Sequence, residues 1–144
     1  MSFNIAIDGP AGAGKSTIAK KIAKELGFVC VDTWAMYRAM ALYFLRSNIS
    51  NEDEQAISRA SENVEITIQY ENGEQQVFLN GENVSGEIRK EEVGNMASKT
   101  SGYGQVRKKL VELQQQLAKK ADVVMDGRDI GTVVLPDAPV SYTH

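Results

Sequence analysis

The sequence has few of the residues that mark secreted or membrane-spanning proteins. Its single cysteine, Cys30, cannot form a disulfide within the chain, and the apolar residues around it predict a buried thiol in a reducing cytoplasm. The longest apolar run, Ala39 to Leu45, is far shorter than the roughly 20 residues that cross a bilayer. The N-terminus has no basic region followed by an apolar run, so we expect neither a membrane anchor nor an export signal.

Proline is also scarce, with three in 144 residues, and there is no repeat or low-complexity segment that would mark a linker. We therefore expect one domain over residues 1–144. The net charge of −3 argues against a general binder of polyanions, so nucleic acid is not an expected partner. A local basic site for a small phosphorylated ligand remains compatible with this charge.

What the chain does have is an alternation of strand and helix patterns at its start. Apolar residues over 3–7 indicate a strand, and after a glycine-rich stretch they recur at helical spacing from Ile18 to Leu26, before Gly27. Residues 28–31 read as a second buried strand, and Asp32–Thr33 can cap the next helix. The chain thus begins as β-α-β-α.

The middle of the chain departs from this alternation. Ser50 or Asn51 can cap a short acidic helix, and two strand-like runs then follow, joined across Asn72–Gly73 as a hairpin. The later patterns are two helices and a strand that resumes the parallel core, at 91–98, 106–117 and 123–125. We predict an α/β fold with a doubly wound parallel sheet of the P-loop type, carrying an inserted β-containing region at about 64–89.

A phosphate-binding pattern is the clearest chemical signal. The motif G-x-x-x-x-G-K-[ST] is matched by Gly9, Pro10, Ala11, Gly12, Ala13, Gly14, Lys15 and Ser16, followed by Thr17. Glycines let backbone amides close around phosphate oxygens, and the following helix directs its positive end at the same anion. Lys15 would contact the β and γ phosphates of ATP and Ser16 would supply a Mg²⁺ ligand. The alternative is a glycine-rich turn without a ligand.

Two further clusters follow predicted strands, where α/β proteins bind ligands. Thr33 and Arg38 could hold a phosphate, although a helix cap and a solvated arginine would explain them equally well. Asp126, Arg128 and Asp129 follow the run Val123–Met125. Asp126 stands where an acid could lie near Mg²⁺, and Arg128 could stabilise phosphate charge. The alternative is a structural ion pair between Arg128 and a neighbour. Lys15, Arg38, Asp126 and Arg128 are the candidate catalytic residues.

In combination, these motifs resemble those of bacterial cytidylate kinases along almost the whole chain. The stretches that carry the resemblance are 7–17, 32–33, 35–38, 78–82, 88–89 and 126–134. The resemblance implies transfer of a phosphoryl group from ATP to CMP or dCMP, with 64–89 in an enlarged monophosphate-binding region. It also implies that Thr33, Arg38 and Arg128 lie near the acceptor phosphate, and that the base is read by Ser98, Arg107 and Asp129.

The base-reading assignment is chemically consistent. Cytosine offers an amino donor that Asp129 and Ser98 can accept, beside ring acceptors that Arg107 can satisfy. Uracil would instead place an acceptor against Asp129, so cytosine is expected to be preferred. From the residues alone, Ser98 and Arg107 are also compatible with exposed positions on helices.

Two features depart from the family pattern. Trp34 stands where glycine is usual, and it could obstruct CMP, turn outward or stack on a ligand. The chain also closes with Ser141–His144 where the family continues with a strand and an arginine-rich lid. We therefore expect a truncated chain with little activity of its own. The rival functions are a kinase for another nucleoside monophosphate and a non-catalytic P-loop nucleotide-binding protein.

Overall fold

The computed structural model describes residues 3–9, 15–71, 74–127 and 130–143. Its chain divides into two compact units. The first combines residues 1–33 with residues 114–144, and the second is the continuous stretch 34–113, which contains the predicted insertion at 64–89.

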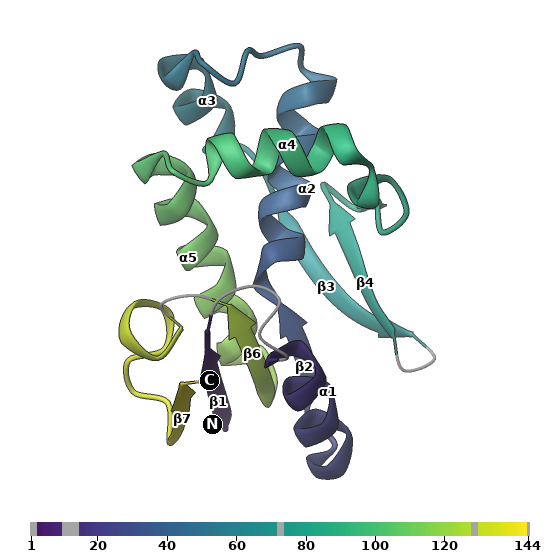
Figure 1. The fold of residues 1–144 in the computed structure, drawn as a ribbon, viewed down its shortest axis with the longest axis vertical. Coiled ribbons are helices and arrows are strands. Elements are labelled where there is room, and N and C mark those ends of the chain that lie inside the picture. Colours follow the sequence, from purple (N-terminus) through teal and green to yellow (C-terminus); the bar gives the residue numbers. More distant parts are fainter. Residues whose placement is uncertain (1–2, 10–14, 72–73, 128–129, 144) are drawn as a thin grey trace. The chain divides into compact units, whose positions relative to one another are not determined.

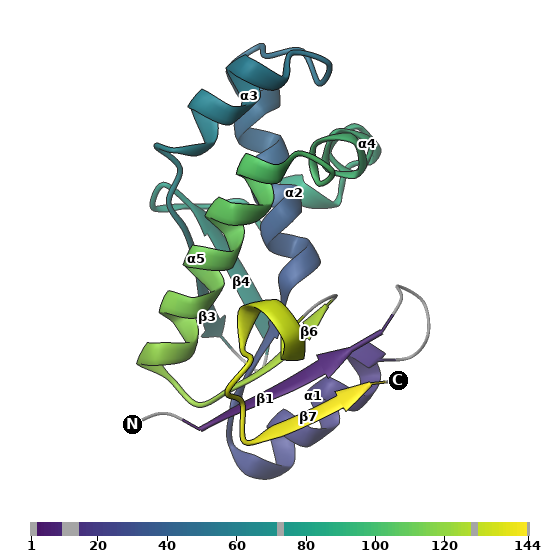
Figure 2. The ribbon, with the colours of Figure 1, turned by 90° about the vertical axis from the view of Figure 1, so that its left-hand side faces the viewer.

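A parallel four-stranded sheet forms the centre of the first unit, in the order β2-β6-β1-β7 (Figure 1), and β1 and β7 run side by side at one edge (Figure 2). Its strands are β1 (Asn4–Asp8), β2 (Val29–Asp32), β6 (Val123–Gly127) and β7 (Val140–Thr143). In the register of β1 and β6, Asn4 lies opposite Val123 and Asp8 opposite Gly127. The predicted α/β fold with a parallel sheet is confirmed. Strand β7, at the edge beside β1, was not predicted.

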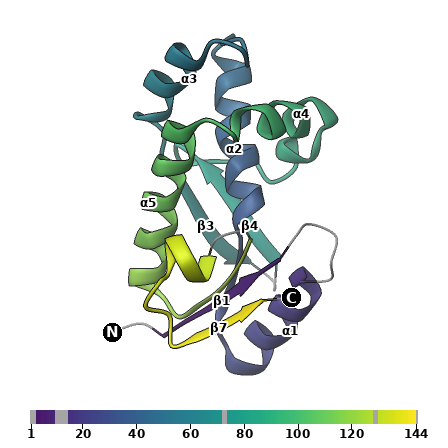
Figure 3. The same ribbon diagram turned by 60° about the vertical axis from the view of Figure 1, so that its left-hand side comes forward.

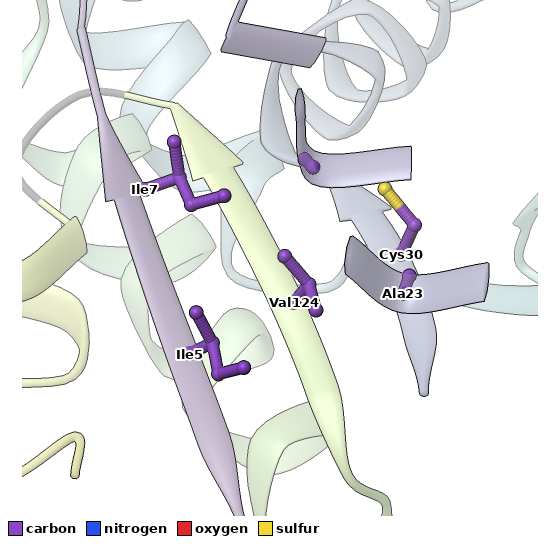
Figure 4. Packing of buried hydrophobic residues seen from close by; sticks show 6 residues of the cluster. Ile5, Ile7, Ala23, Cys30 and Val124 are labelled. Carbon is purple, nitrogen blue, oxygen red and sulfur yellow. The ribbon is translucent and has the colours of Figure 1, made fainter. Parts of the chain in front are cut away.

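Helix α1 (Lys15–Leu26) covers one face of this sheet with the apolar side that its sequence pattern predicts. Its Ala19 and Ala23 pack with Ile5, Ile7, Cys30 and Val124 in a buried cluster (Figure 4). Gly27 ends the helix with a positive φ of 72°, as its predicted C-cap role requires. Leu26, however, is 52% exposed, because it lies in the last turn, beyond the packed part of the face.

A short helical turn, η2 (Ile130–Val134), lies on the other face of the sheet from α1 (Figure 3). The Leu135 N–H that follows it donates to the Ile130 carbonyl at 2.6 Å, and Gln115 of α5 (Gly104–Lys120) donates its Nε2 to the Val134 carbonyl at 3.0 Å. The sequence pattern did not reveal this turn. It immediately follows the predicted catalytic segment 126–129.

Helices make up most of the second unit. They are α2 (Thr33–Arg46), α3 (Glu54–Ser61) and α4 (Glu91–Thr100), with the first part of α5 and the short turn η1 (Glu87–Arg89). Helix α4 lies across α2 (Figure 1), and α2 buries Met36, Met40 and Phe44. The predicted cap of α3 was wrong. Asp53 caps the helix by accepting the Ala56 N–H at 3.2 Å, whereas the Ser50 hydroxyl accepts from Glu52 N in the preceding turn.

The predicted hairpin is confirmed in this second unit. Strands β3 (Ile66–Glu71) and β4 (Glu74–Leu79) are antiparallel, with Ile66 opposite Leu79, and a short third strand, β5 (Glu82–Asn83), extends the sheet. Asn80 and Gly81 turn the chain between β4 and β5 with positive φ angles of 50° and 87°. Residues 72–73 lie outside the described part of the chain.

An exposed ion-pair cluster joins the end of α2 to the segments after β4. Arg46 Nη2 lies 3.0 Å from Glu82 Oε2 and 2.9 Å from Glu87 Oε2. The hydrogen bonds that Arg46 donates to Glu82 and then to Glu87 raise the pKa of Arg46, and the bond to Glu82 lowers the pKa of that glutamate. Both shifts favour the charged pair.

None of the helices in the described ranges is both long enough and apolar enough to cross a membrane.

Candidate functional site

The carboxyl ends of three adjacent strands bring polar residues to one edge of the parallel sheet. Asp32 of β2 lies opposite Asp126 of β6, and Asp8 of β1 lies opposite Gly127. Asp126 is buried, with 1% of its surface exposed, whereas Asp8 and Asp32 are half-buried. Ligands of α/β sheets bind at this edge. Asp126 therefore lies at the end of the sheet where the sequence analysis expected it, and its role beside Mg²⁺ stays a prediction.

The predicted phosphate loop starts at this same edge. Gly9 follows β1 directly, and its N–H donates to the Gly127 carbonyl at 3.2 Å. Lys15 and Ser16 lie in the first turn of α1, and Thr17 is exposed there. The rest of the predicted loop, Pro10, Ala11, Gly12, Ala13 and Gly14, lies outside the described residues. The strand and the helix on either side of the loop have the arrangement that presents a helix N-terminus to phosphate.

Thr33 makes a contact that the sequence did not reveal. Its side chain is buried, and its Oγ1 donates to the Asp126 carbonyl at 2.9 Å. A hydroxyl carries a single proton, so in this arrangement Thr33 has no donor left for a phosphate oxygen. A Cβ at Gly127 would clash with the Thr33 hydroxyl and lie 3.2 Å from Ile130 Cδ1, which explains the glycine there.

Asp8 makes a second contact that the sequence analysis missed. Its Oδ1 accepts the Ile130 N–H at 2.5 Å, and its Oδ2 accepts the Gly131 N–H at 2.9 Å. Arg128 and Asp129 lie outside the described residues, but the residues on both sides of them are fixed by these bonds and by Gly9. The sequence did contain a signal for this contact. Asp8 is a carboxylate that ends an apolar strand directly before the phosphate loop.

In the second unit, α2 and α4 position the Arg38 guanidinium. Its Nη1 donates to the Ile88 carbonyl at 3.0 Å, and the residue is half-buried. A Cβ at Gly94 of α4 would lie 3.4 Å from Arg38 Nη2, so this glycine leaves room for the guanidinium. One carbonyl contact uses one of five N–H donors and leaves the fork able to bind phosphate as well. The arginine is therefore held by its neighbours, whereas the alternative expectation was a solvated side chain.

The other predicted residues of the second unit lie on helix surfaces. Ser98 of α4 and Arg107 of α5 are both exposed. Trp34, in the first turn of α2, is 38% exposed, and its ring packs against Tyr37 with centroids 5.6 Å apart and planes 31° apart. The indole thus packs against Tyr37 and remains partly exposed to solvent.

Comparisons with known proteins identify the family of this chain. The family model described as cytidylate kinase matches residues 5–142. Curated cytidylate kinases are 54% identical over 94% of this chain in Caldicellulosiruptor saccharolyticus, and 53% identical over 99% of it in Caldanaerobacter subterraneus subsp. tengcongensis. The Bacillus cereus protein of the same name is 51% identical over 96% of the chain. The chain spans 60%, 62% and 61% of the lengths of these relatives, respectively.

Proposed function

This chain belongs to the cytidylate kinase family, and on that premise we propose that the protein transfers the γ-phosphoryl group of ATP to CMP or dCMP, giving ADP and CDP or dCDP. The observation that carries the proposal is the sheet edge at which β1 runs into the phosphate motif beside the buried Asp126. This edge would supply phosphate-binding backbone and an oxygen ligand next to each other.

The donor nucleotide would be held by residues Gly9 to Thr17. Backbone amides of the glycine-rich stretch and the α1 N-terminus would bind its phosphates, and Lys15 would place a point charge at the β and γ phosphates. Mg²⁺ prefers oxygen ligands, and Ser16 and Asp126 provide a hydroxyl and a carboxylate of that kind. When bound, the ion neutralises charge on the transferred group.

The acceptor would be held by residues from several elements. Arg38 and Arg128 would neutralise its phosphate, and Ser98, Arg107 and Asp129 would read its cytosine ring. Thr33 would have to turn its hydroxyl away from the Asp126 carbonyl before it could donate to phosphate. Alternatively, Thr33 would keep its present hydrogen bond and fix the backbone of Asp126 and Gly127. Phosphoryl transfer depends mainly on such positioning and charge stabilisation.

Two further properties are part of this proposal. The single cysteine, Cys30, is buried in the core, which suits a cytoplasmic enzyme. Small-molecule nucleotides are the proposed partners, and we do not propose a nucleic acid.

The test is a panel of acceptors, CMP, dCMP, UMP and AMP, assayed with Mg²⁺ and ATP for release of ADP. The assay uses a chain completed to the length of the matched relatives, because residues 1–144 alone are expected to have little activity. We expect CMP or dCMP to be preferred. Preference for UMP or AMP would indicate a kinase for another monophosphate, and ATP binding without transfer to any acceptor would indicate a non-catalytic nucleotide-binding protein.

Lys15→Ala sharpens this test at the donor site. Loss of a charge that acts on the transferring group should lower turnover on the order of a hundredfold, while the backbone cradle keeps most of the ATP affinity. The matched control is Lys24→Ala, an exposed lysine in the last turn of the same helix, which should change neither quantity. Equal turnover by the Lys15 and Lys24 variants would remove Lys15 from the mechanism.

A further inference from the structure

The dipeptide Asp8–Gly9 binds the backbone on both sides of residues 128–129. On one side, the Gly9 N–H donates to the Gly127 carbonyl at 3.2 Å. On the other, the Asp8 carboxylate accepts from Ile130 N at 2.5 Å and from Gly131 N at 2.9 Å. The end of β1 is therefore hydrogen-bonded to the backbone immediately before residue 128 and immediately after residue 129.

The chemistry of this contact requires a carboxylate. Two backbone N–H groups at the start of η2 point at two separate oxygens, and each bond is charge-assisted. An asparagine could offer one oxygen, but its amino group would then face an N–H donor. The approach is also close, because a Cβ at Gly131 would lie 3.1 Å from Asp8 Oδ2 and would clash with the Ser141 hydroxyl. Glycine at 131 keeps the N–H within reach of Asp8.

We propose that Asp8 is a positioning residue, whose carboxylate fixes the backbone around Arg128 and Asp129 and thereby sets acceptor affinity and base selectivity. This inference rests on the proposed function, in which Arg128 binds the acceptor phosphate and Asp129 reads cytosine. Asp8 itself does not touch the nucleotide in this role. It acts through the main chain of Gly127, Ile130 and Gly131.

The placement of Asp8 also links the two substrates. Its neighbour Gly9 is the first residue of the phosphate motif, so a single dipeptide ends β1, begins the donor loop and holds the acceptor segment. The carboxylate contact is the part of this link that mutation can remove selectively.

The experiment compares Asp8→Asn with Asp122→Asn in the purified protein, completed to the length of the relatives that the chain matches. Asp122 is the matched control, because its Oδ1 also accepts a backbone N–H, from Phe3 at 2.6 Å, but it directly precedes β6 at the opposite end of that strand from Asp126. Dissociation constants for CMP, UMP and ATP are measured by titration calorimetry, and unfolding by urea is followed for each variant. We expect Asp8→Asn to weaken CMP binding on the order of tenfold and to narrow the ratio of CMP to UMP affinity.

Comparing the affinities for CMP, UMP and ATP separates a positioning role of Asp8 from a general loss of stability. With Asp8→Asn, ATP affinity should stay within about twofold, and Asp122→Asn should leave all three affinities unchanged even where it lowers the urea midpoint. Equal losses for CMP, UMP and ATP, or unchanged CMP affinity and selectivity, would overturn the role of Asp8 while leaving the proposed function intact. If the unmodified protein does not bind CMP, the proposed function fails, and this inference fails with it.

A second variant keeps the test decisive if Asp8→Asn does not fold. Gly131→Ala, made together with Ser141→Ala, removes the hydroxyl that the new methyl group would meet and leaves Asp8 Oδ2 as its nearest polar neighbour. The expected result is the same selective loss of CMP affinity. Ser141→Ala alone is its control and should bind CMP normally. Unchanged CMP binding by the double variant would contradict the proposal.

Discussion

The two units hold their distant segments together in different ways. In the first, short side chains and glycines bring backbones into close contact, as with Thr33 on the Asp126 carbonyl and Asp8 on the Ile130 N–H. In the second, long side chains reach across, as with Arg46 to Glu82 and Tyr103 to the Asn51 carbonyl. The first arrangement is closely packed, and the second bridges larger separations.

This difference predicts how each unit responds to change. A short buried contact has no room for added atoms, since its partners cannot move apart without breaking main-chain hydrogen bonds. A long side chain at an exposed position loses rotamer freedom when it is ordered, so its contact contributes less and its loss is tolerated.

The largest effect is expected from Gly127→Ala. The new methyl group would clash with the Thr33 hydroxyl and lie 3.3 Å from Thr33 Cβ, so we expect a loss of about 1–3 kcal/mol of unfolding free energy, measured by urea denaturation. Gly104→Ala is the control in α5, where nothing lies within 4 Å, and it should be neutral or slightly stabilising. Adding Thr33→Ala should recover part of the loss. An unaltered urea midpoint for Gly127→Ala would mean that the first unit is not closely packed there.

A smaller effect is expected from Tyr103→Phe in the second unit. The Tyr103 hydroxyl donates to the Asn51 carbonyl at 2.6 Å in a partly buried position, and its loss should cost about 1 kcal/mol in the same measurement. Tyr43→Phe is the control, because Tyr43 is half-buried and its hydroxyl has no hydrogen bond within the described ranges. If both variants unfold at the same urea concentration, the Tyr103 contact contributes nothing to stability. The contacts that long side chains make in the second unit would then be weaker than we infer.

The smallest effect should follow from Arg46→Met. The pair with Glu82 is exposed and open to screening by salt, so a slight decrease in the urea midpoint is expected, and it should vanish at high ionic strength. Because the contact lowers the pKa of Glu82, its stabilisation is present above the unfolded pKa of the glutamate. It is lost as pH falls through the lower folded pKa.

The difference between the wild-type protein and the Arg46→Met variant should therefore shrink only in acid, below the usual pKa of glutamate, about 4.3. Arg59→Met provides the comparison, since Arg59 is exposed and has no ion pair in the described part of the structure. A gap between the two variants that grows toward acid pH would contradict this direction of the pH dependence.

The sequence predicted those elements whose cause is local. The helical spacing of Ile18 and Ile22 and the stop at Gly27 predicted α1, and alternation on either side of Asn72–Gly73 predicted the hairpin. Strand β7 escaped prediction because only its pairing with β1 makes Val140–Thr143 a strand. Turn η2 escaped prediction because its first N–H groups bind Asp8, which is far away in the sequence.

The candidate site divides in the same way. The phosphate motif is a continuous pattern, so it was readable from the chain. Asp126 lies near the end of β6, as the strand pattern predicted, and its role stays a prediction. The contacts of Thr33 and Asp8 join residues 93 and 122 positions apart, and no local pattern encodes such pairs. The roles of Ser98, Arg107, Arg128 and Asp129 remain predictions that rest on the family.

The position of Trp34 gives the protein a built-in optical reporter. It is the only tryptophan of the chain, so all indole emission comes from the first turn of α2, one residue after Thr33. With the ring partly exposed and Tyr37 beside it, that emission should respond to collisional quenchers and should receive excitation energy from the neighbouring phenol. Changes at this turn can therefore be followed in stopped-flow fluorescence without any attached dye.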